Sequence, residues 1–167
     1  MSLIVLGIDP GSRVTGYGVV AEEQEHLQHL NSGHINLSTR LPQSQRLLRI
    51  HQRLMELLKT HKPGALAVEE VFLAHNVQSA LKLGQVRGVV LLAAAQAGVP
   101  VFEYSALVLK KAVVGYGQAS KAQVKLMVEQ LLGQPVTNHN AADALALSLC
   151  HLFHARQQRL FAGHTPV

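Results

Sequence analysis

An apolar run at the start of the chain, Leu3–Ile8, ends in a single carboxylate, Asp9, followed at once by a Pro-Gly turn. An uninterrupted apolar run of this length, bounded by turn residues, is typical of a buried strand. Two further strand patterns, Thr15–Ala21 and Leu27–Ile35, follow over short polar connections. Because short connections favour antiparallel neighbours, the N-terminal part of the chain is predicted to form a three-stranded meander.

The rest of the chain alternates helical and strand patterns. Expected in order are a helix opened by Pro42, a strand over 65–72, a helix over 77–97, a strand in "VPVFEY", a helix capped by Ser120 and Gln123 and ended by Gly133, and a helix starting near Asn140. This order predicts one α/β domain over residues 1–156, with a five-stranded mixed sheet flanked by helices. Residues 157–167 are expected to form a polar, disordered tail.

Composition restricts the possible functions. The 167 residues are 48% hydrophobic and carry a formal charge of +5. Such a charge suits an anionic partner such as nucleic acid, although many small domains are basic without one.

The single cysteine, Cys150, excludes an intrachain disulfide and a cysteine-based zinc site. No signal sequence or membrane-spanning run is visible, so a cytoplasmic protein with no membrane partner is expected.

Three acidic residues lie in otherwise apolar surroundings: Asp9, Glu69 in "LAVEEVF" and Asp143 in "NAADALAL". Placing the first and fourth strands side by side would bring Asp9 and Glu69 to one sheet edge, where the last helix would deliver Asp143. Converging carboxylates repel one another unless a cation lies between them. Oxygen ligands without cysteine suit Mg²⁺ or Mn²⁺, and two such ions can activate water for phosphodiester hydrolysis.

Each acid also has a purely structural interpretation. Asp9 before Pro-Gly fits an ordinary turn aspartate. Glu69 or Glu70 fits a surface acid at a strand end. Asn140 and Asp143 fit a helix N-cap followed by an acid in the first turn, which is compatible with a metal-binding role.

A second candidate region is the stretch "AVVGYGQAS", which Lys110, Lys111 and Lys121 flank. It is expected to be a glycine-containing loop whose basic flanks suit phosphate contact, or simply a solvated loop. Phe72 and Tyr116 are candidates for stacking on nucleic-acid bases. Phe72 fits the hydrophobic core equally well.

Six segments together resemble the RuvC family of bacterial Holliday-junction resolvases, over Leu3 to about His154. They are "GIDPGSRVTGYGVV", "AVEEVF", "SALKLGQVRGV", "VFEY", "VVGYGQASKAQV" and "AADALALSLCH". The resemblance implies the RNase H-like fold. It also implies a homodimer that cuts two opposed strands of four-way junction DNA in recombination and repair, with RuvA and RuvB as partners in branch migration.

The same resemblance implies a site that holds Mg²⁺ or Mn²⁺, two ions per subunit. The family's four metal-binding positions fall on Asp9, Glu69, Asn140 and Asp143. Lys121 would approach the scissile phosphate, and Lys110 and Phe72 match positions associated with DNA. The helix that contains Gly84 and Gly88 would contribute to the dimer interface.

Asn140 departs from the family pattern, in which this position is usually Asp and sometimes His. An amide is a poorer metal ligand than a carboxylate. Three explanations remain open: a substitution designed to allow binding without cleavage, a natural variant in which His139 or water completes the site, or a weakly active enzyme.

Two other functions are compatible with the sequence. One is a junction-binding protein that does not cleave, which Asn140 makes plausible. The other is a phosphate-binding ATPase of the actin-like and sugar-kinase class, whose members are usually longer and two-lobed.

Overall fold

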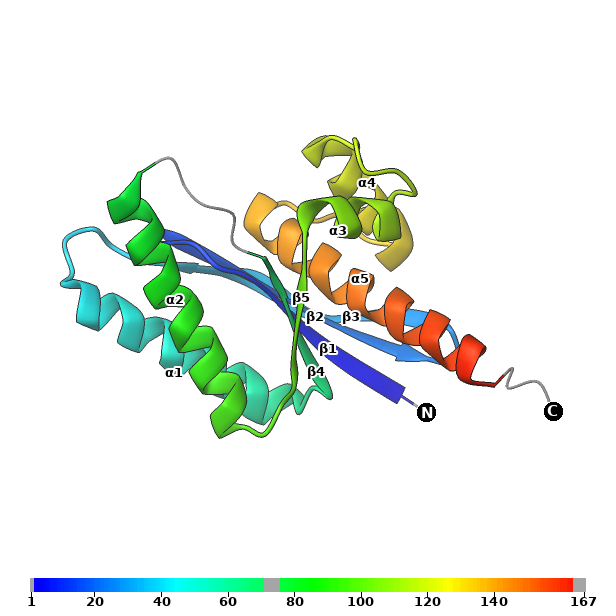
Figure 1. Cartoon of the computed structure of the whole chain (residues 1–167), viewed down its shortest axis with the longest axis horizontal. Coiled ribbons are helices and arrows are strands. Elements are labelled where there is room, and N and C mark those ends of the chain that lie inside the picture. The colour runs from blue at the N-terminus through cyan, green and yellow to red at the C-terminus, as the bar shows by residue number, and fades with distance from the viewer. Residues whose placement is uncertain (1, 71–75, 164–167) are drawn as a thin grey trace.

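A five-stranded mixed sheet forms the centre of the computed structural model, which describes residues 2–70 and 76–163 (Figure 1). The strands lie in the order β3-β2-β1-β4-β5. The elements are β1 (Ser2–Asp9), β2 (Val14–Glu23), β3 (His26–Asn36), α1 (Gln43–His61), β4 (Ala65–Glu69), α2 (Val77–Gln96), β5 (Val101–Tyr104), α3 (Ala106–Val113), α4 (Lys121–Leu132) and α5 (His139–Ala162). The predicted meander followed by β/α units is confirmed. Within the described residues, no helix is long and apolar enough to cross a membrane.

The central strand β1 determines where the acidic residues lie. It pairs antiparallel with β2, which places Asp9 opposite Gly16. It pairs parallel with β4, with Ile8 opposite Val68. The residues that follow in each strand, Asp9 and Glu69, are therefore the last residues of two neighbouring parallel strands, and they leave the sheet at the same edge.

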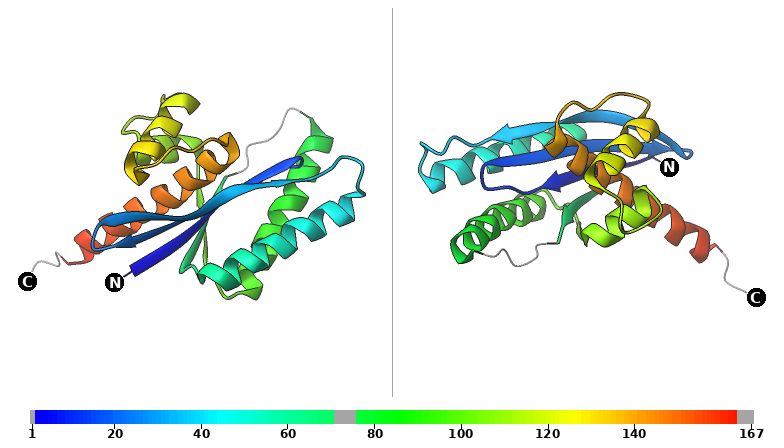
Figure 2. Two further views of the ribbon diagram at one scale, coloured as in Figure 1. Left: turned by 180° about the vertical axis from the view of Figure 1, so that it is seen from behind. Right: turned by 90° about the horizontal axis from the view of Figure 1, so that it is seen from above.

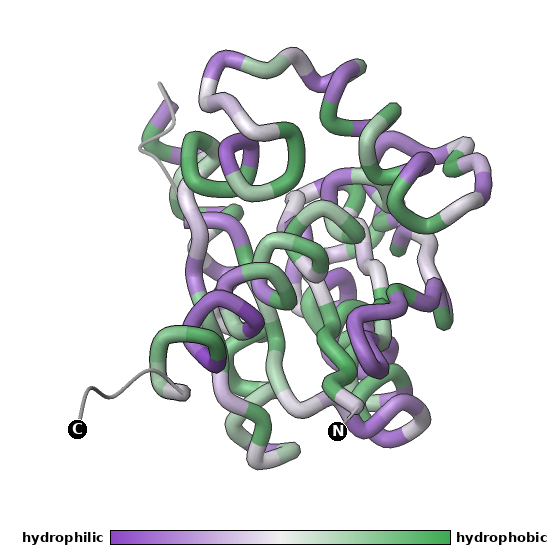
Figure 3. Tube along the Cα trace, turned by 90° about the vertical axis from the view of Figure 1, so that its right-hand side faces the viewer, coloured by the Kyte–Doolittle hydropathy of each residue, from purple (hydrophilic) through white to green (hydrophobic). Residues whose placement is uncertain are grey.

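Alternating residues of the inner strands supply two separate hydrophobic cores. Val5 and Val20 pack with α5, α3 and α4 on one face of the sheet. Leu6 and Val19 pack with α1 and α2 on the other face. Figure 2 shows the two helical layers on opposite sides of the sheet, and Figure 3 shows hydrophobic segments running through the centre of the molecule. The inner strands β1, β2 and β4 are buried on both faces, as continuous apolar runs predict, whereas the edge strands β3 and β5 are partly exposed.

Three strand glycines allow α5 to lie directly against the sheet. A Cβ atom at Gly7 would lie 2.0 Å from the carbonyl oxygen of Ala144, and one at Gly16 would lie 2.1 Å from that of Asn140. A Cβ atom at Gly18 would lie 2.7 Å from the backbone nitrogen of Leu145. At these three positions no side chain fits between the strands and the helix, so the glycines set the distance at which α5 crosses β1 and β2.

The start of α5 differs from the prediction in one detail. Its N-cap is Asn138, whose side chain accepts a hydrogen bond from the backbone nitrogen of Ala141 at 3.1 Å. The prediction of Asn140 as the cap was therefore wrong. Asn140 lies inside the first turn and its side chain is not used for capping. The predicted cap of α4 is confirmed, because Ser120 and Gln123 form a reciprocal capping box.

The end of α5 corrects a second expectation. The helix continues to Ala162, so the prediction of a disordered tail from residue 157 is wrong as far as that residue. Arg156 and Arg159 both form ion pairs with Glu22 of β2, whose side chain is only 4% exposed. This contact fixes the last turns of α5 to the β2–β3 hairpin. A further difference is α3, a helix that the sequence patterns did not predict.

The glycine contacts predict a large penalty for adding one methyl group at Gly7. The Gly7→Ala variant should lower the free energy of unfolding by at least roughly 2 kcal/mol, because α5 must move away from the sheet. The matched control is Gly64→Ala, whose Cβ atom would meet the side-chain tip of Leu3 at 3.1 Å and the carbonyl oxygen of Ile4 at an ordinary contact distance of 3.9 Å. Urea unfolding should show a change below about 1 kcal/mol for the control. Equal losses in the two variants would contradict this account of the contact.

Candidate active site

Three elements bring carboxylates to the same edge of the sheet. Asp9 ends β1 and Glu69 ends β4, whereas Asp143 lies in the first part of α5. The close packing of Asn140 on Gly16, the strand partner of Asp9, holds the start of α5 over this edge. The predicted convergence of the three acids is therefore present, and Asn140 lies beside it.

The carboxylates perturb one another. Burial, followed by the charges of Asp143 and Glu69, raises the pKa of Asp9 to about 7, and Lys121 opposes this rise. Burial and the charge of Asp143 raise the pKa of Glu69, whereas Lys121 and Lys110 lower it. Burial also raises the pKa of Asp143, against the lowering effects of Lys121 and His139. Ionising all three acids together is unfavourable without additional positive charge.

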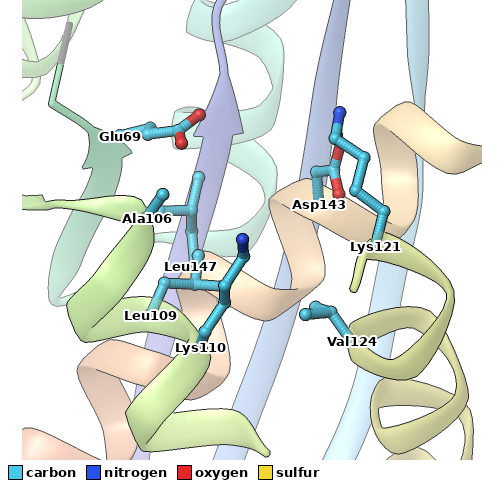
Figure 4. A pocket seen from close by; sticks show the side chains of 8 residues that line it. All are labelled: Glu69, Ala106, Leu109, Lys110, Lys121, Val124, Asp143 and Leu147. Atoms are coloured by element: carbon cyan, nitrogen blue, oxygen red, sulfur yellow. The ribbon is translucent and has the colours of Figure 1, made fainter. Parts of the chain in front are cut away.

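A small pocket lies between two of these acids. Glu69 and Asp143 line it from opposite sides, and two lysines, Lys110 from α3 and Lys121 from α4, extend toward it (Figure 4). The Nζ atom of Lys121 lies 3.8 Å from Oδ2 of Asp143. The pocket volume of about 120 Å³ is below that of typical small-molecule sites. The site therefore suits ions and the edge of a large anionic substrate better than an enclosed ligand.

The donor chemistry fits a hard divalent cation. The candidate ligands are carboxylate oxygens, and the only cysteine, Cys150, is buried on α5 with a pKa raised by burial to about 12. Among the described residues, no three His, Cys, Asp or Glu side chains form a ready-made group around one ion. Mg²⁺ is commonly held by one or two carboxylates with water and substrate phosphate completing its shell. The arrangement fits that mode of binding.

Only some of the other predicted DNA-contacting residues line this pocket. Lys110 and Lys121 line it, whereas Lys111 and Tyr116 are exposed and are not among its lining residues. Tyr116 lies between α3 and α4, and 46% of its surface is exposed. Phe72 lies outside the described residues.

Sequence reasoning missed two features that support the site. The strand glycines carry a recognisable signal, because Gly16 and Gly18 are two residues apart and so face the same side of β2. The second feature is Arg87 of α2, which donates a hydrogen bond to the backbone carbonyl of Glu69 at 3.0 Å. No local pattern marks that contact, since it joins residues on separate elements.

The sheet order and the acids at the ends of β1 and β4 and on α5 define an α/β protein of the RNase H-like class. The sequence model of the family described as "Crossover junction endodeoxyribonuclease RuvC" matches residues 5–151. The chain belongs to the RuvC family.

Individual relatives agree with this assignment. The crossover junction endodeoxyribonuclease RuvC of Geobacter metallireducens is 51% identical over 148 residues, which cover 88% of this chain and 90% of the relative. Among solved structures, Thermus thermophilus RuvC is similar with a TM-score of 0.86 and 41% identity, over 93% of this chain and 97% of that chain. The same protein in complex with Holliday junction substrate gives a TM-score of 0.88 at 40% identity, over 93% and 96% of the two chains.

The raised pKa of Asp9 predicts that the metal-free protein becomes less stable to unfolding as the pH rises. The unfolded carboxyl ionises near its ordinary pKa of 3.8, whereas the folded one resists ionisation until about pH 7. Stability is therefore lost as the pH rises from about 4 to about 7. With chelator present, Asp9→Asn should raise the free energy of unfolding near pH 8 by roughly 2 to 4 kcal/mol and change it little near pH 4. A variant no more stable than the original chain near pH 8 would contradict the assigned environment of Asp9.

Proposed function

We propose that this chain is a Holliday-junction resolvase that hydrolyses phosphodiester bonds in four-way DNA. The observation that carries the proposal is the edge where Asp9, Glu69 and Asp143 converge beside Lys110 and Lys121. Membership of the RuvC family and the similarity to a RuvC solved with Holliday junction substrate support it. The expected products are a 5′-phosphate and a 3′-hydroxyl in each of two opposed strands, within recombination and repair in the cytoplasm.

The carboxylates are proposed to hold Mg²⁺, or Mn²⁺ in its place, with two ions per subunit. Asp9 would be the shared ligand, because its strand β1 pairs with β4, which carries Glu69, and packs against α5, which carries Asp143 and Asn140. When bound, such ions supply an activated water and stabilise the leaving oxygen of the phosphodiester. Burial of Asp9 restricts its motion and its access to water, so the chain provides a fixed oxygen ligand whose ionised form a bound cation would favour.

The lysines are proposed to orient the DNA strand. Lys121 is 86% exposed at its side chain yet lies beside Asp143, so it can contact a phosphate that enters the pocket. Lys110 lines the opposite wall (Figure 4). Lys111 and Tyr116, and Phe72 outside the described residues, are proposed to contact the junction further from the scissile bond.

The outward face of α2 is proposed to bind a second copy of the chain. Its exposed apolar residues are Val77, Leu81, Leu91 and Leu92, with exposures of 75%, 63%, 38% and 54%. Gly84 and Gly88 lie between them, and nothing lies within 4 Å of a Cβ atom added at either. A symmetric dimer would present one site to each of two equivalent strands of a junction. Association with RuvA and RuvB is proposed from family membership alone.

Asn140 favours a second candidate function, a protein that binds junctions without cutting them. An amide in place of a carboxylate lowers the negative charge available to a cation at this edge. Tight junction binding without cleavage in Mg²⁺ or Mn²⁺ would select this function. Tight ATP binding without junction binding would select the ATPase alternative.

Restoring a carboxylate at position 140 should increase metal-dependent cleavage. We expect Asn140→Asp to cut a synthetic four-way junction at least about tenfold faster in Mg²⁺ or Mn²⁺, because a charged ligand binds the cation more strongly. The measurement is the single-turnover cleavage rate on end-labelled junctions.

The matched control for this prediction is Asn138→Asp. It adds the same charge two residues earlier, where Asp caps a helix as well as Asn does. The control should leave the cleavage rate within about twofold of the original chain. Equal rates for Asn140→Asp and the original chain would exclude position 140 as a metal ligand.

The proposed dimer face predicts an effect on assembly and on paired cutting. Leu81→Glu places a charge in the apolar stripe of α2 and should yield a monomer in sedimentation experiments. In the Asn140→Asp background it should also convert paired cuts into single nicks. The control is Leu160→Glu on α5, since Leu160 is 61% exposed and Leu81 is 63% exposed. Dimers in both variants would argue against this face.

A further inference from the structure

Arg87 lies where helix α2 passes the carboxyl end of β4. Its Nη1 atom donates a hydrogen bond to the backbone carbonyl of Glu69 at 3.0 Å. The same guanidinium forms an ion pair with Glu103 of the neighbouring strand β5. The Arg87 side chain is only 17% exposed, and that of Glu103 is 45% exposed. One partly buried cation thus connects α2 to the ends of two strands.

The contact falls on the peptide unit that follows Glu69. Its carbonyl oxygen accepts the hydrogen bond from Arg87, and its N–H, which belongs to Glu70, donates to the carbonyl of Tyr104 at 2.9 Å. Both polar ends of this one peptide plane are therefore held, one by α2 and one by β5. Glu69 is the last residue of β4, so these two bonds act where the strand ends.

A hydrogen bond from a charged donor in a partly buried setting is stronger than an ordinary backbone bond. Fixing the peptide plane after Glu69 restricts the backbone rotation that would otherwise swing its side chain. A ligand that is already oriented loses less conformational freedom when it binds an ion. Arg87 approaches from the α1–α2 side of the sheet, opposite α5, and so has no need to touch the ion or the DNA.

We propose that Arg87 is a positioning residue, which orients Glu69 for cation binding by holding the backbone carbonyl of Glu69. The inference rests on the proposed junction-cleaving function for its catalytic consequence. Helix α2 would then have two roles. Its outward face would bind a second copy of the chain, and its sheet-facing side would hold Glu69 through Arg87.

The test compares three variants of the full chain. Arg87→Met keeps the apolar stem and removes both polar contacts, Arg87→Lys keeps the charge with a single donor group, and Glu103→Gln removes only the charge of the second partner. Three quantities are measured: Mn²⁺ affinity of the DNA-free protein by calorimetry, hydrogen exchange of the Glu70 amide by NMR, and the Mg²⁺ dependence of cleavage in the Asn140→Asp background.

Arg87→Met should weaken Mn²⁺ binding about tenfold, as expected for the loss of a hydrogen bond from a charged donor. Exchange of the Glu70 amide should accelerate by a similar factor, and the Mg²⁺ concentration for half-maximal cleavage should rise. Arg87→Lys should recover part of each effect, and Glu103→Gln should stay within about twofold of the original chain in Mn²⁺ affinity. The affinity of all three variants for junction DNA, measured with a metal chelator present, should equal that of the original chain.

Unchanged Mn²⁺ affinity in a folded Arg87→Met variant would overturn the proposal, leaving Arg87 a purely structural contact. Equal losses of affinity in Arg87→Met and Glu103→Gln would also overturn it, by assigning the effect to the ion pair. If Arg87→Met does not fold, the test passes to Arg87→Lys. An Arg87→Lys variant that binds Mn²⁺ as tightly as the original chain would overturn the proposal. A chain that never cuts junctions would refute the proposed function, while Mn²⁺ affinity and amide exchange would still test Arg87.

Discussion

The direct contact between α5 and the two central strands is the constraint on which the rest of the structure depends. At Gly7, Gly16 and Gly18 no side chain separates the sheet from the helix, and the hydroxyl of Ser148 donates a hydrogen bond to the carbonyl oxygen of Gly18 at 2.9 Å. A larger residue at any of these glycines would push α5 outward. The position of Asp143 relative to Asp9 would then be lost, because the two acids belong to different elements joined by this contact.

That same contact creates an electrostatic problem. It brings Asp143 close to Asp9 and Glu69 in a partly buried setting, where burial raises all three pKa values and repulsion between carboxylates raises those of Asp9 and Glu69 further. The nearby lysines offset only part of this repulsion. A fold that keeps such a cluster sacrifices stability in the absence of a cation, as is common at functional sites. Helix α2 restrains the cluster from the other face through Arg87.

Much of this arrangement could be predicted from local patterns. Strand patterns place Asp9 and Glu69 near strand ends, but the parallel pairing of β1 and β4 that brings them to one edge is only a hypothesis from sequence, since local patterns do not determine which strands pair. Asn138 and Asn140 are equally good capping residues, so sequence alone could not choose between them. The last turns of α5 depend on the pairing of Glu22 with Arg156 and Arg159, more than 130 residues away in the chain. Long-range contacts of this kind have no local signature.

The central claim is that Asp9 is the shared anchor of a cation site at this edge of the sheet. A crystal structure of the Asn140→Asp variant grown in Mn²⁺ tests it most directly, because anomalous scattering locates the metal without reference to activity. The account predicts anomalous density within bonding distance of Asp9, on the sides that face Glu69 and Asp143. Bound Mn²⁺ elsewhere, with no density at Asp9, would contradict it.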